Sequence, residues 1–391
     1  MTTRTYQRNG SMVSLLGFGC MRLPRLYPDK QDIDYDKAQE MIDYAYSHGV
    51  NYYDTAYVYH EGKSEVFIGE ALKKYPRESF YLADKMPGWA IQNGADGAKK
   101  IFEEQLSRCQ VNYFDFYLLH SLGDRKNYET TYAESGVLTY LDGEKAAGRI
   151  RNLGFSFHGS VDFFAYLMEQ RKWDFAQIQL NYLDWEGQNA KKLYELAEQY
   201  GVQLIIMEPV RGGSLVSLCD ESIEILKKAK PDKSAASWAI RFAATPADVL
   251  CVLSGMTTME HVTDNVATIE NFIPLEDDEY AVLSEAVAAY LNKGTISCTG
   301  CRYCMECPSG VDIPGIFAVY NKCAASGNLP VSLRQNDSAY QKKLRAFQEA
   351  FESIPASARP DQCISCGKCV EHCPQSIKIP ERMKEIAGRL K

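Results

Sequence analysis

The sequence has no long uninterrupted apolar segment. No stretch approaches the ~20 consecutive apolar residues that a membrane-spanning helix needs. Residues 1–10 are polar, and the apolar run after them is interrupted by Gly17 and Gly19, a pattern unlike that of a signal peptide. We therefore expect a soluble, cytoplasmic protein that does not interact with a membrane.

An excess of positive charge is also missing. The 43 Lys and Arg residues are outnumbered by 51 Asp and Glu residues, which gives a formal net charge of −8. Binding to a nucleic-acid backbone requires clustered Lys and Arg side chains that neutralise phosphates. The charge balance therefore indicates that nucleic acid is not a partner.

The thirteen cysteines lack the spread-out spacing of a disulfide framework. Eight of them fall in two tight runs near the C-terminus, at the spacing of metal ligands, which favours a reducing compartment. The other five stand alone and are expected to be small buried residues: Cys20, Cys109, Cys219, Cys251 and Cys323.

The first three quarters of the chain alternate between short apolar runs and segments with helical periodicity. The runs with strand character are 15–21, 50–56, 80–85, 115–121, 150–156, 176–182, 202–209 and 249–256. The helical patterns are 36–47, 63–74, 96–109, 137–147, 160–171, 187–200, 221–229, 234–244 and 258–269. Parallel strands need helix-length connections, so this alternation predicts a parallel sheet. Eight such units suit a closed (β/α)₈ TIM barrel, which typically takes ~250 residues.

The ends of the strand segments favour the barrel over an open doubly wound sheet. Each run changes to polar or glycine residues at its C-terminal end, which is where the active sites of such barrels lie. An open sheet would need a G-x-G-x-x-G turn after its first strand, and residues 17–22 do not complete one. We therefore expect a barrel over residues 1–290 and a small, mainly helical and loop-rich domain over 291–391.

The spacing of the clustered cysteines predicts that this second domain is ferredoxin-like. Its second run, Cys363-x₂-Cys366-x₂-Cys369-x₃-Cys373-Pro374, is typical of bacterial two-cluster ferredoxins, in which the fourth cysteine ligates the other cluster. Two [4Fe–4S] clusters are therefore expected. The crossed arrangement assigns one to Cys298, Cys301, Cys304 and Cys373, and the other to Cys307, Cys363, Cys366 and Cys369.

The first cysteine run departs from the ferredoxin spacing. It has two residues rather than three between Cys304 and Cys307, which leaves the assignment of Cys307 open. Zinc is the alternative metal, but zinc sites favour two cysteine pairs over two triplets that each have a trailing Cys-Pro. Residues 336–352, between the runs, predict one helix, and residues 381–391 predict a short basic helix that faces solvent.

Several segments of the barrel resemble the aldo/keto reductase family. In addition to Lys85 at the end of its strand, they are GFGCMRLP (17–24), DTAYVYHEGKSE (54–65), LLH (118–120), GFSFHG (154–159), QLNY (179–182), EPVRGGSL (208–215) and SGMTTMEHVTDN (254–265). The resemblance covers about 70% of the chain. With the cysteine runs, the whole chain is similar to the iron–sulfur branch of that family. This implies a metal-binding oxidoreductase that interconverts a small carbonyl compound and an alcohol.

The resemblance implies a catalytic tetrad of Asp54, Tyr59, Lys85 and His120. Reduction of a carbonyl needs a proton for its oxygen, and Tyr59 would donate it as general acid or accept it during oxidation. The ammonium of Lys85 would lower the pKa of the phenol, and Asp54 would pair with Lys85. His120 would orient the carbonyl by hydrogen bonding.

A nicotinamide cofactor follows from the same resemblance. The expected cofactor-binding residues are Gly19, Met21, Asp54, Ser156, Gln179, Pro209, Gly255, Thr257 and Asn265. Ser156 and Gln179 would contact the carboxamide, whereas the last three would hold the phosphate and adenine end. Phe157 stands where the family commonly has Asn, and His261 stands where it has the arginine for the 2′-phosphate. NADP, NAD and even a flavin therefore remain open.

Two classes of function are compatible with these features. In the first, the chain is an NAD(P)-linked enzyme whose clusters either exchange electrons with a ferredoxin-type partner or form a structural cap. In the second, the barrel is catalytically silent and the clusters serve an electron-transfer or scaffold protein. A hydride carries two electrons and each cluster accepts one, so direct exchange between them needs a mediator or a radical step. The intact tetrad favours the enzyme.

Overall fold

The structure is a computed structural model that describes residues 1–27, 30–330 and 338–391. The chain divides into two compact units. Unit 1 comprises Met1–Val210 and Ala236–Leu275, and unit 2 comprises Arg211–Ala235 and Glu276–Lys391. The domain boundary expected at residue 290 remains a prediction. Among the described residues, no helix has the length and apolar character needed to cross a membrane.

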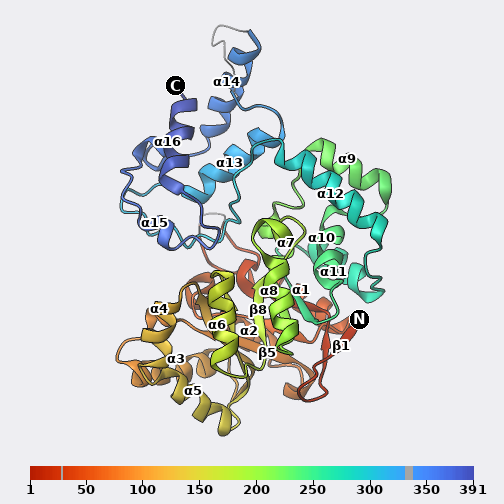
Figure 1. The fold of residues 1–391 in the computed structure, drawn as a ribbon, viewed down its shortest axis with the longest axis vertical. Coiled ribbons are helices and arrows are strands. Elements are labelled where there is room, and N and C mark those ends of the chain that lie inside the picture. Colours follow the sequence, from red (N-terminus) through yellow and green to blue (C-terminus); the bar gives the residue numbers. More distant parts are fainter. Residues whose placement is uncertain (28–29, 331–337) are drawn as a thin grey trace. The chain divides into compact units, whose positions relative to one another are not determined.

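Unit 1 contains a closed barrel of eight parallel strands, which confirms the expected fold class (Figure 1). In order around the barrel these are β10 (Val249–Gly255), β3 (Leu16–Gly19), β4 (Tyr52–Asp54), β5 (Tyr81–Met86), β6 (Phe114–Leu122), β7 (Ile150–Phe157), β8 (Ala176–Gln179) and β9 (Leu204–Met207). Each strand overlaps a segment predicted to be one. The strands are buried along most of their length, as parallel strands covered by helices are, and their sequences therefore read as continuous apolar runs.

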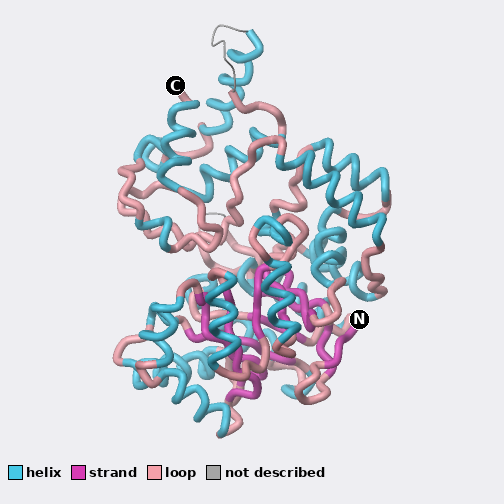
Figure 2. The backbone as a smooth tube through the Cα atoms, viewed as in Figure 1, coloured by secondary structure: helices cyan, strands magenta, loops and turns pink. Residues whose placement is uncertain are grey.

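Helices surround these strands, as the backbone tube in Figure 2 shows. Those that overlap predicted helices are α1 (Tyr35–Ser47), α2 (Lys63–Leu72), α3 (Gly94–Arg108), α5 (Val137–Ala146), α6 (Val161–Gln170), α8 (Ala190–Gln199), α10 (Ala235–Ala244) and α11 (Met259–Glu270). Short helices α4 (Arg125–Tyr128) and α7 (Asp184–Gly187) follow β6 and β8. Side-chain caps start several of them: Asp34 accepts a hydrogen bond from the Lys37 amide at α1, and Thr258 accepts one from the His261 amide at α11.

A short antiparallel hairpin, β1 (Thr3–Thr5) and β2 (Met12–Ser14), closes the N-terminal end of the barrel. Tyr6 and Val13 of this segment belong to the same buried cluster as the inward-facing residues of the strands. Arg4 donates hydrogen bonds to the carbonyls of Ala244 and Pro246, just before β10. Because this end is filled, only the C-terminal ends of the strands can open into an active site.

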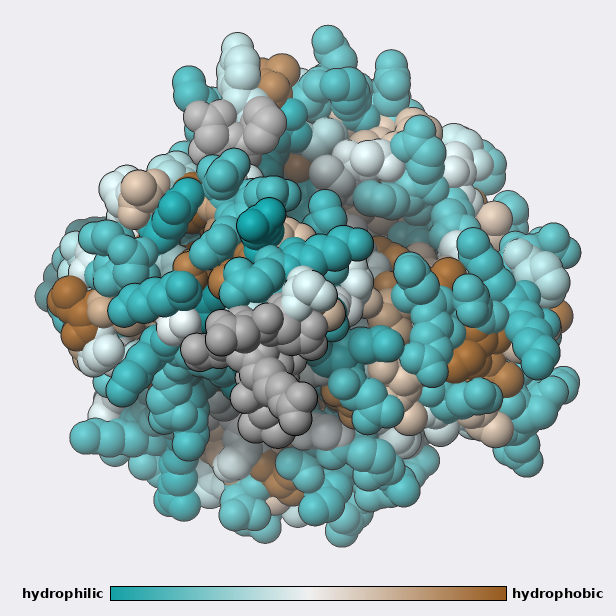
Figure 3. Space-filling model, turned by 90° about the horizontal axis from the view of Figure 1, so that it is seen from above, coloured by the Kyte–Doolittle hydropathy of each residue, from teal (hydrophilic) through white to brown (hydrophobic). Residues whose placement is uncertain are grey.

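Unit 2 is built from helices and loops. Its helices are α9 (Asp220–Ala229), α12 (Asp277–Leu291), α13 (Ile313–Ala325), α14 (Ser338–Phe351), α15 (Lys368–Glu371) and α16 (Ile379–Arg389). Helix α14 lies within the helix expected over 336–352, of which 336 and 337 fall outside the described residues. The expectation that the last helix faces solvent holds for only one face of α16, because Met383 and Ile386 on the other face are fully buried in the core of this unit. The face drawn in Figure 3 is mostly hydrophilic, with hydrophobic residues in small groups.

Candidate active site and cysteine cavities

A buried ion pair lies at the C-terminal ends of β4 and β5. The Nζ atom of Lys85 donates to Oδ1 of Asp54 and to the carbonyl of Thr55, both at 2.6 Å. The two side chains are at most 4% exposed. Burial raises the pKa of Asp54, although the neighbouring Lys85 ammonium acts in the opposite direction. Removing one partner of such a pair costs about 3–5 kcal/mol because the other charge is left buried and unpaired.

Tyr59 and His120 converge on this ion pair. Tyr59 opens the turn that follows β4, and the Lys85 Nζ lies 4.9 Å from the centroid of its ring. The His120 ring, near the end of β6, has its centroid 6.2 Å from that of Tyr59, and the two rings are nearly perpendicular at 83°. The structure thus brings together all four residues of the expected tetrad.

The environment fixes the protonation states of the two rings. Burial, followed by the Asp54 carboxylate, raises the pKa of Tyr59 well above its ordinary value. Desolvation therefore dominates the pKa of Tyr59, and the expected lowering by Lys85 stays a prediction. Burial and then the Lys85 ammonium hold the pKa of His120 well below its ordinary value. At neutral pH the phenol keeps its proton and the imidazole is uncharged.

The expected cofactor-binding residues lie at or just beyond the C-terminal ends of strands, or in α11. They are Gly19, Met21, Asp54, Ser156, Gln179, Pro209, Gly255, Thr257 and Asn265. The hydroxyl of Ser156 accepts a hydrogen bond from the Ser121 amide at 2.7 Å, so its own proton remains available to donate. The Asn265 amide donates to the Ser254 hydroxyl at 2.9 Å.

The polar groups at this end of the barrel fit a nicotinamide nucleotide. The Ser156 hydroxyl is a suitable partner for a carboxamide, and the N-terminus of α11 suits a phosphate. Nε2 of Gln179 donates to Oδ2 of Asp184 at 2.6 Å, so this residue is already engaged within the barrel. Nδ1 of His120 is buried and has no hydrogen-bond partner among the described residues, which leaves an unsatisfied polar atom beside Tyr59. Bound substrate or nucleotide would satisfy it.

Sequence reasoning missed two features beside the tetrad. The first is Trp89, which is 57% exposed and whose ring centroid lies 5.0 Å from that of His120. The sequence could have indicated Trp89, because it follows the C-terminal end of β5 by three residues and active sites of such barrels lie at those ends. The second is an ion pair of 3.5 Å between Arg22 and Glu208, which join the loops after β3 and β9. No spacing in the sequence indicates that pair.

In unit 2, two small cavities are each lined by four cysteines. Cys298, Cys301, Cys304 and Cys373 line one. Cys307, Cys363, Cys366 and Cys369 line the other. None of these cysteines forms a disulfide within the described part of the chain, and no three Cys, His, Asp or Glu side chains there are arranged to hold a single metal ion. Four thiols around each cavity fit the ligand set of a [4Fe–4S] cluster.

The loop that contains Gly212 and Gly213, here called the glycine loop, lies against the first of these cavities. Arg211 is 2% exposed and donates to Oε1 of Gln375 at 3.4 Å. A Cβ on Gly212 would lie only 1.9 Å from the carbonyl oxygen of Thr299. Thr299 and Gln375 both line the cavity that contains Cys298. The loop therefore packs directly on the first cysteine run, and position 212 has room only for glycine.

Comparison with known proteins identifies both parts of the chain. Residues 15–288 match the model of the aldo/keto reductase family, and residues 297–377 match that of the 4Fe-4S dicluster domain. L-galactose dehydrogenase of Arabidopsis thaliana is 24% identical over 305 residues, 73% of this chain and 93% of that protein. NADH-specific methylglyoxal reductase of Escherichia coli (strain K12) is 24% identical over 301 residues, 66% of this chain and 90% of that protein. Probable aldo-keto reductase 1 of Glycine max is 27% identical over 213 residues, 52% of this chain and 58% of that protein.

Solved structures share the barrel fold. The aldo-keto reductase of Bacillus halodurans in its holo form has a TM-score of 0.61 and 23% identity, covering 73% of this chain and 96% of its own. An aldo-keto reductase of Klebsiella pneumoniae in complex with NADPH has a TM-score of 0.58 and 21% identity, covering 73% of this chain and 95% of its own. With its family model matched over most of its length, the chain belongs to the aldo/keto reductase family of oxidoreductases and carries a C-terminal 4Fe-4S dicluster domain.

Proposed function

We propose that this protein is a cytoplasmic NADP- or NAD-linked reductase of small carbonyl compounds, in which Tyr59 transfers the proton. The convergence of Tyr59 and His120 on the buried pair of Lys85 and Asp54 carries this proposal. The names of relatives support the substrate class, since one is a methylglyoxal reductase, and a structural neighbour was solved with NADPH.

The residues of the site divide the work of carbonyl reduction. A bound nicotinamide nucleotide supplies the hydride. Tyr59 holds a proton at neutral pH and gives it to the carbonyl oxygen. The Lys85 ammonium then stabilises the phenolate that remains. His120, which is uncharged, offers a hydrogen bond that orients the carbonyl, and Trp89 provides an aromatic wall beside it.

The cysteines of unit 2 belong to the same proposal. Cys298, Cys301, Cys304 and Cys373 would hold one [4Fe–4S] cluster, and Cys307, Cys363, Cys366 and Cys369 the other. Clusters held by these thiols would supply single-electron transfer, which suits a ferredoxin-type partner. Cys366 is exposed, and Ile364, which lines the same cavity, is 66% exposed, which supports electron exchange at the surface of the second cavity.

Substitution of Tyr59 tests this function. With methylglyoxal as probe and NADH or NADPH as donor, Tyr59→Phe should lower kcat about 100-fold or more, because it removes the proton donor and leaves the ring in place. Tyr200→Phe, at a 39% exposed position outside the site, is the matched control. Wild-type turnover in Tyr59→Phe, or oxidation of neither nucleotide by the wild type, would overturn the proposal.

A further inference from the structure

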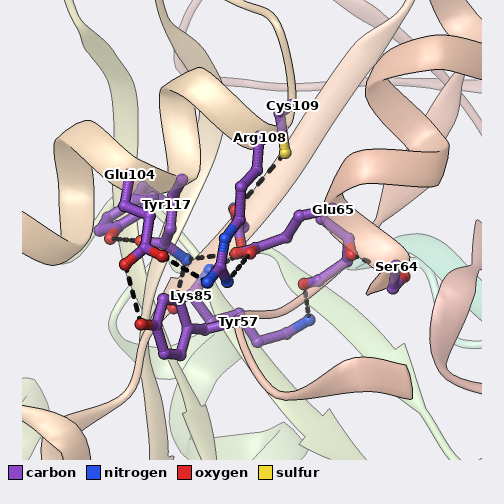
Figure 4. Close-up of polar contacts among 11 residues, drawn as sticks. Tyr57, Ser64, Glu65, Lys85, Glu104, Arg108, Cys109 and Tyr117 are labelled. Carbon is purple, nitrogen blue, oxygen red and sulfur yellow. Dashed lines mark hydrogen bonds and ion pairs between the residues drawn. The ribbon is translucent and has the colours of Figure 1, made fainter. Parts of the chain in front are cut away.

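A buried polar network lies behind Lys85, between β5 and the helices α2 and α3 (Figure 4). Asp84, the neighbour of Lys85, faces away from the active site because side chains alternate along a strand. It hydrogen-bonds with Glu65 of α2, and both carboxyl groups are fully buried. Burial, followed by the neighbouring Glu65 side chain, raises the pKa of Asp84 well above its ordinary value. The tetrad uses neither residue.

Gln105 of α3 connects this network to the main chain of Lys85. Its Nε2 donates to Oε1 of Glu65 at 3.1 Å and to the Lys85 carbonyl at 3.0 Å. Its Oε1 accepts a hydrogen bond from the Tyr117 hydroxyl. Because both ends of the buried amide are satisfied, α3 fixes the Lys85 backbone from behind.

Arg108, one turn further along α3, connects the same network to the turn that carries Tyr59. It donates to Oε2 of Glu65 at 2.8 Å and pairs with Glu104. Its guanidinium lies 4.6 Å from the centroid of the Tyr57 ring, and the Tyr57 hydroxyl donates to Oε2 of Glu104 at 2.9 Å. Figure 4 shows Tyr57, Glu104, Arg108 and Glu65 in one connected group.

The turn needs such support because its backbone is strained. His60 and Glu61, directly after Tyr59, have φ angles of 51° and 57°, in the left-handed region that non-glycine residues rarely adopt. Strained backbone of this kind persists only when contacts with neighbouring residues hold it in place. Arg108 contacts both ends of this turn. Its guanidinium lies over the ring of Tyr57, before the strained residues, and a Cβ on Gly62, after them, would lie 3.2 Å from the same guanidinium.

We propose that Arg108 is a positioning residue, which fixes Tyr59 relative to Lys85 by holding the 57–62 turn and the Lys85 strand to one helix. This inference rests on the proposed function of Tyr59. Displacement of a reacting group by about 1 Å can cost 100-fold in rate, so a residue that sets this distance affects kcat.

Arg108→Ala, Arg108→Lys and Glu103→Ala form the test set. Glu103 lies on the same helix and pairs with Arg149 at 2.7 Å, outside the network, so it controls for loss of an ion pair from α3. We expect Arg108→Ala to lower kcat about 10-fold or more, with the KM for nucleotide within about 2-fold of wild type. Arg108→Lys should recover part of the loss, and Glu103→Ala should match wild type.

Hydrogen exchange gives a second measurement that needs no substrate. In the full-length, cluster-loaded protein, Arg108→Ala should speed amide exchange in residues 54–62 about 10-fold, and Glu103→Ala should not. Unchanged kcat and unchanged exchange in Arg108→Ala, or the same effects in Glu103→Ala, would overturn the inference. If Tyr59→Phe keeps full turnover, the proposed function fails, while exchange in residues 54–62 still decides whether Arg108 holds the turn.

Discussion

At the scale of single residues, the site combines two rings whose charge states burial has fixed in opposite ways. Tyr59 stays a neutral acid because desolvation disfavours the phenolate, and His120 stays a neutral base because desolvation disfavours the imidazolium. Lys85 is the only cation among the four tetrad residues, and its ammonium donates a hydrogen bond to Asp54. In the proposed function, a carbonyl oxygen that enters the site would therefore meet a phenol that still carries its proton.

These charge states predict a flat pH dependence of carbonyl reduction. The lowered pKa of His120 means that it gains a proton only well below about pH 6.5, and the raised pKa of Tyr59 means that it loses one only well above about pH 10. We expect kcat/KM for methylglyoxal to stay constant from pH 6 to pH 8 at fixed ionic strength. A transition near pH 6.5 that disappears in His120→Asn would contradict this expectation.

At the scale of elements, the sequence predicted those strands and helices that leave a local pattern of apolar residues. All eight barrel strands were found because buried parallel strands leave continuous apolar runs. The hairpin of β1 and β2 was missed because β1, Thr3–Thr5, is polar throughout and leaves no apolar run. Helix α12 was missed although the capping box of Glu276 and Glu279 marks its start. The Arg108 network could not be found, since it joins α2, α3 and β5 through contacts that no spacing reveals.

The glycine loop of unit 2 gives a prediction at this scale. Gly212→Ala should destabilise the protein by about 3 kcal/mol or more, because its Cβ would overlap the Thr299 carbonyl and its φ is 64°. Gly213→Ala is the matched control: it also has a positive φ, 93°, but nothing lies within 4 Å of its added Cβ. Its cost should be about 1–2 kcal/mol. Thermal unfolding of the two variants compares them, and equal midpoints would contradict the expectation.

At the scale of the whole molecule, the two cysteine runs are interdependent. Cys373 of the second run lines the cavity of the first, and Cys307 of the first run lines the cavity of the second. The sequence predicted this crossing from the ferredoxin-like second run, even though the first run is one residue short. Each cavity is therefore lined by cysteines of both runs, and the crossed ligation of two clusters stays a prediction.

Paired cysteine variants test the crossing. Under anaerobic conditions Cys373→Ala and Cys301→Ala should lose the same cluster, leaving about four irons per chain and the same residual electron paramagnetic resonance spectrum after reduction. Cys307→Ala and Cys366→Ala should both lose the second cluster and should share the residual spectrum of the first. A Cys373→Ala protein whose spectrum matches that of Cys366→Ala would show that each run binds its own cluster.

The crossing also sets an order of events during biosynthesis. The first cavity has its four thiols only after Cys373 has left the ribosome, and the second only after Cys369 has, long after the barrel strands have been synthesised. Domains fold as units, with the N-terminal ones first, so the barrel can form while the cysteines are still being translated. We therefore expect iron–sulfur loading to follow the folding of the barrel.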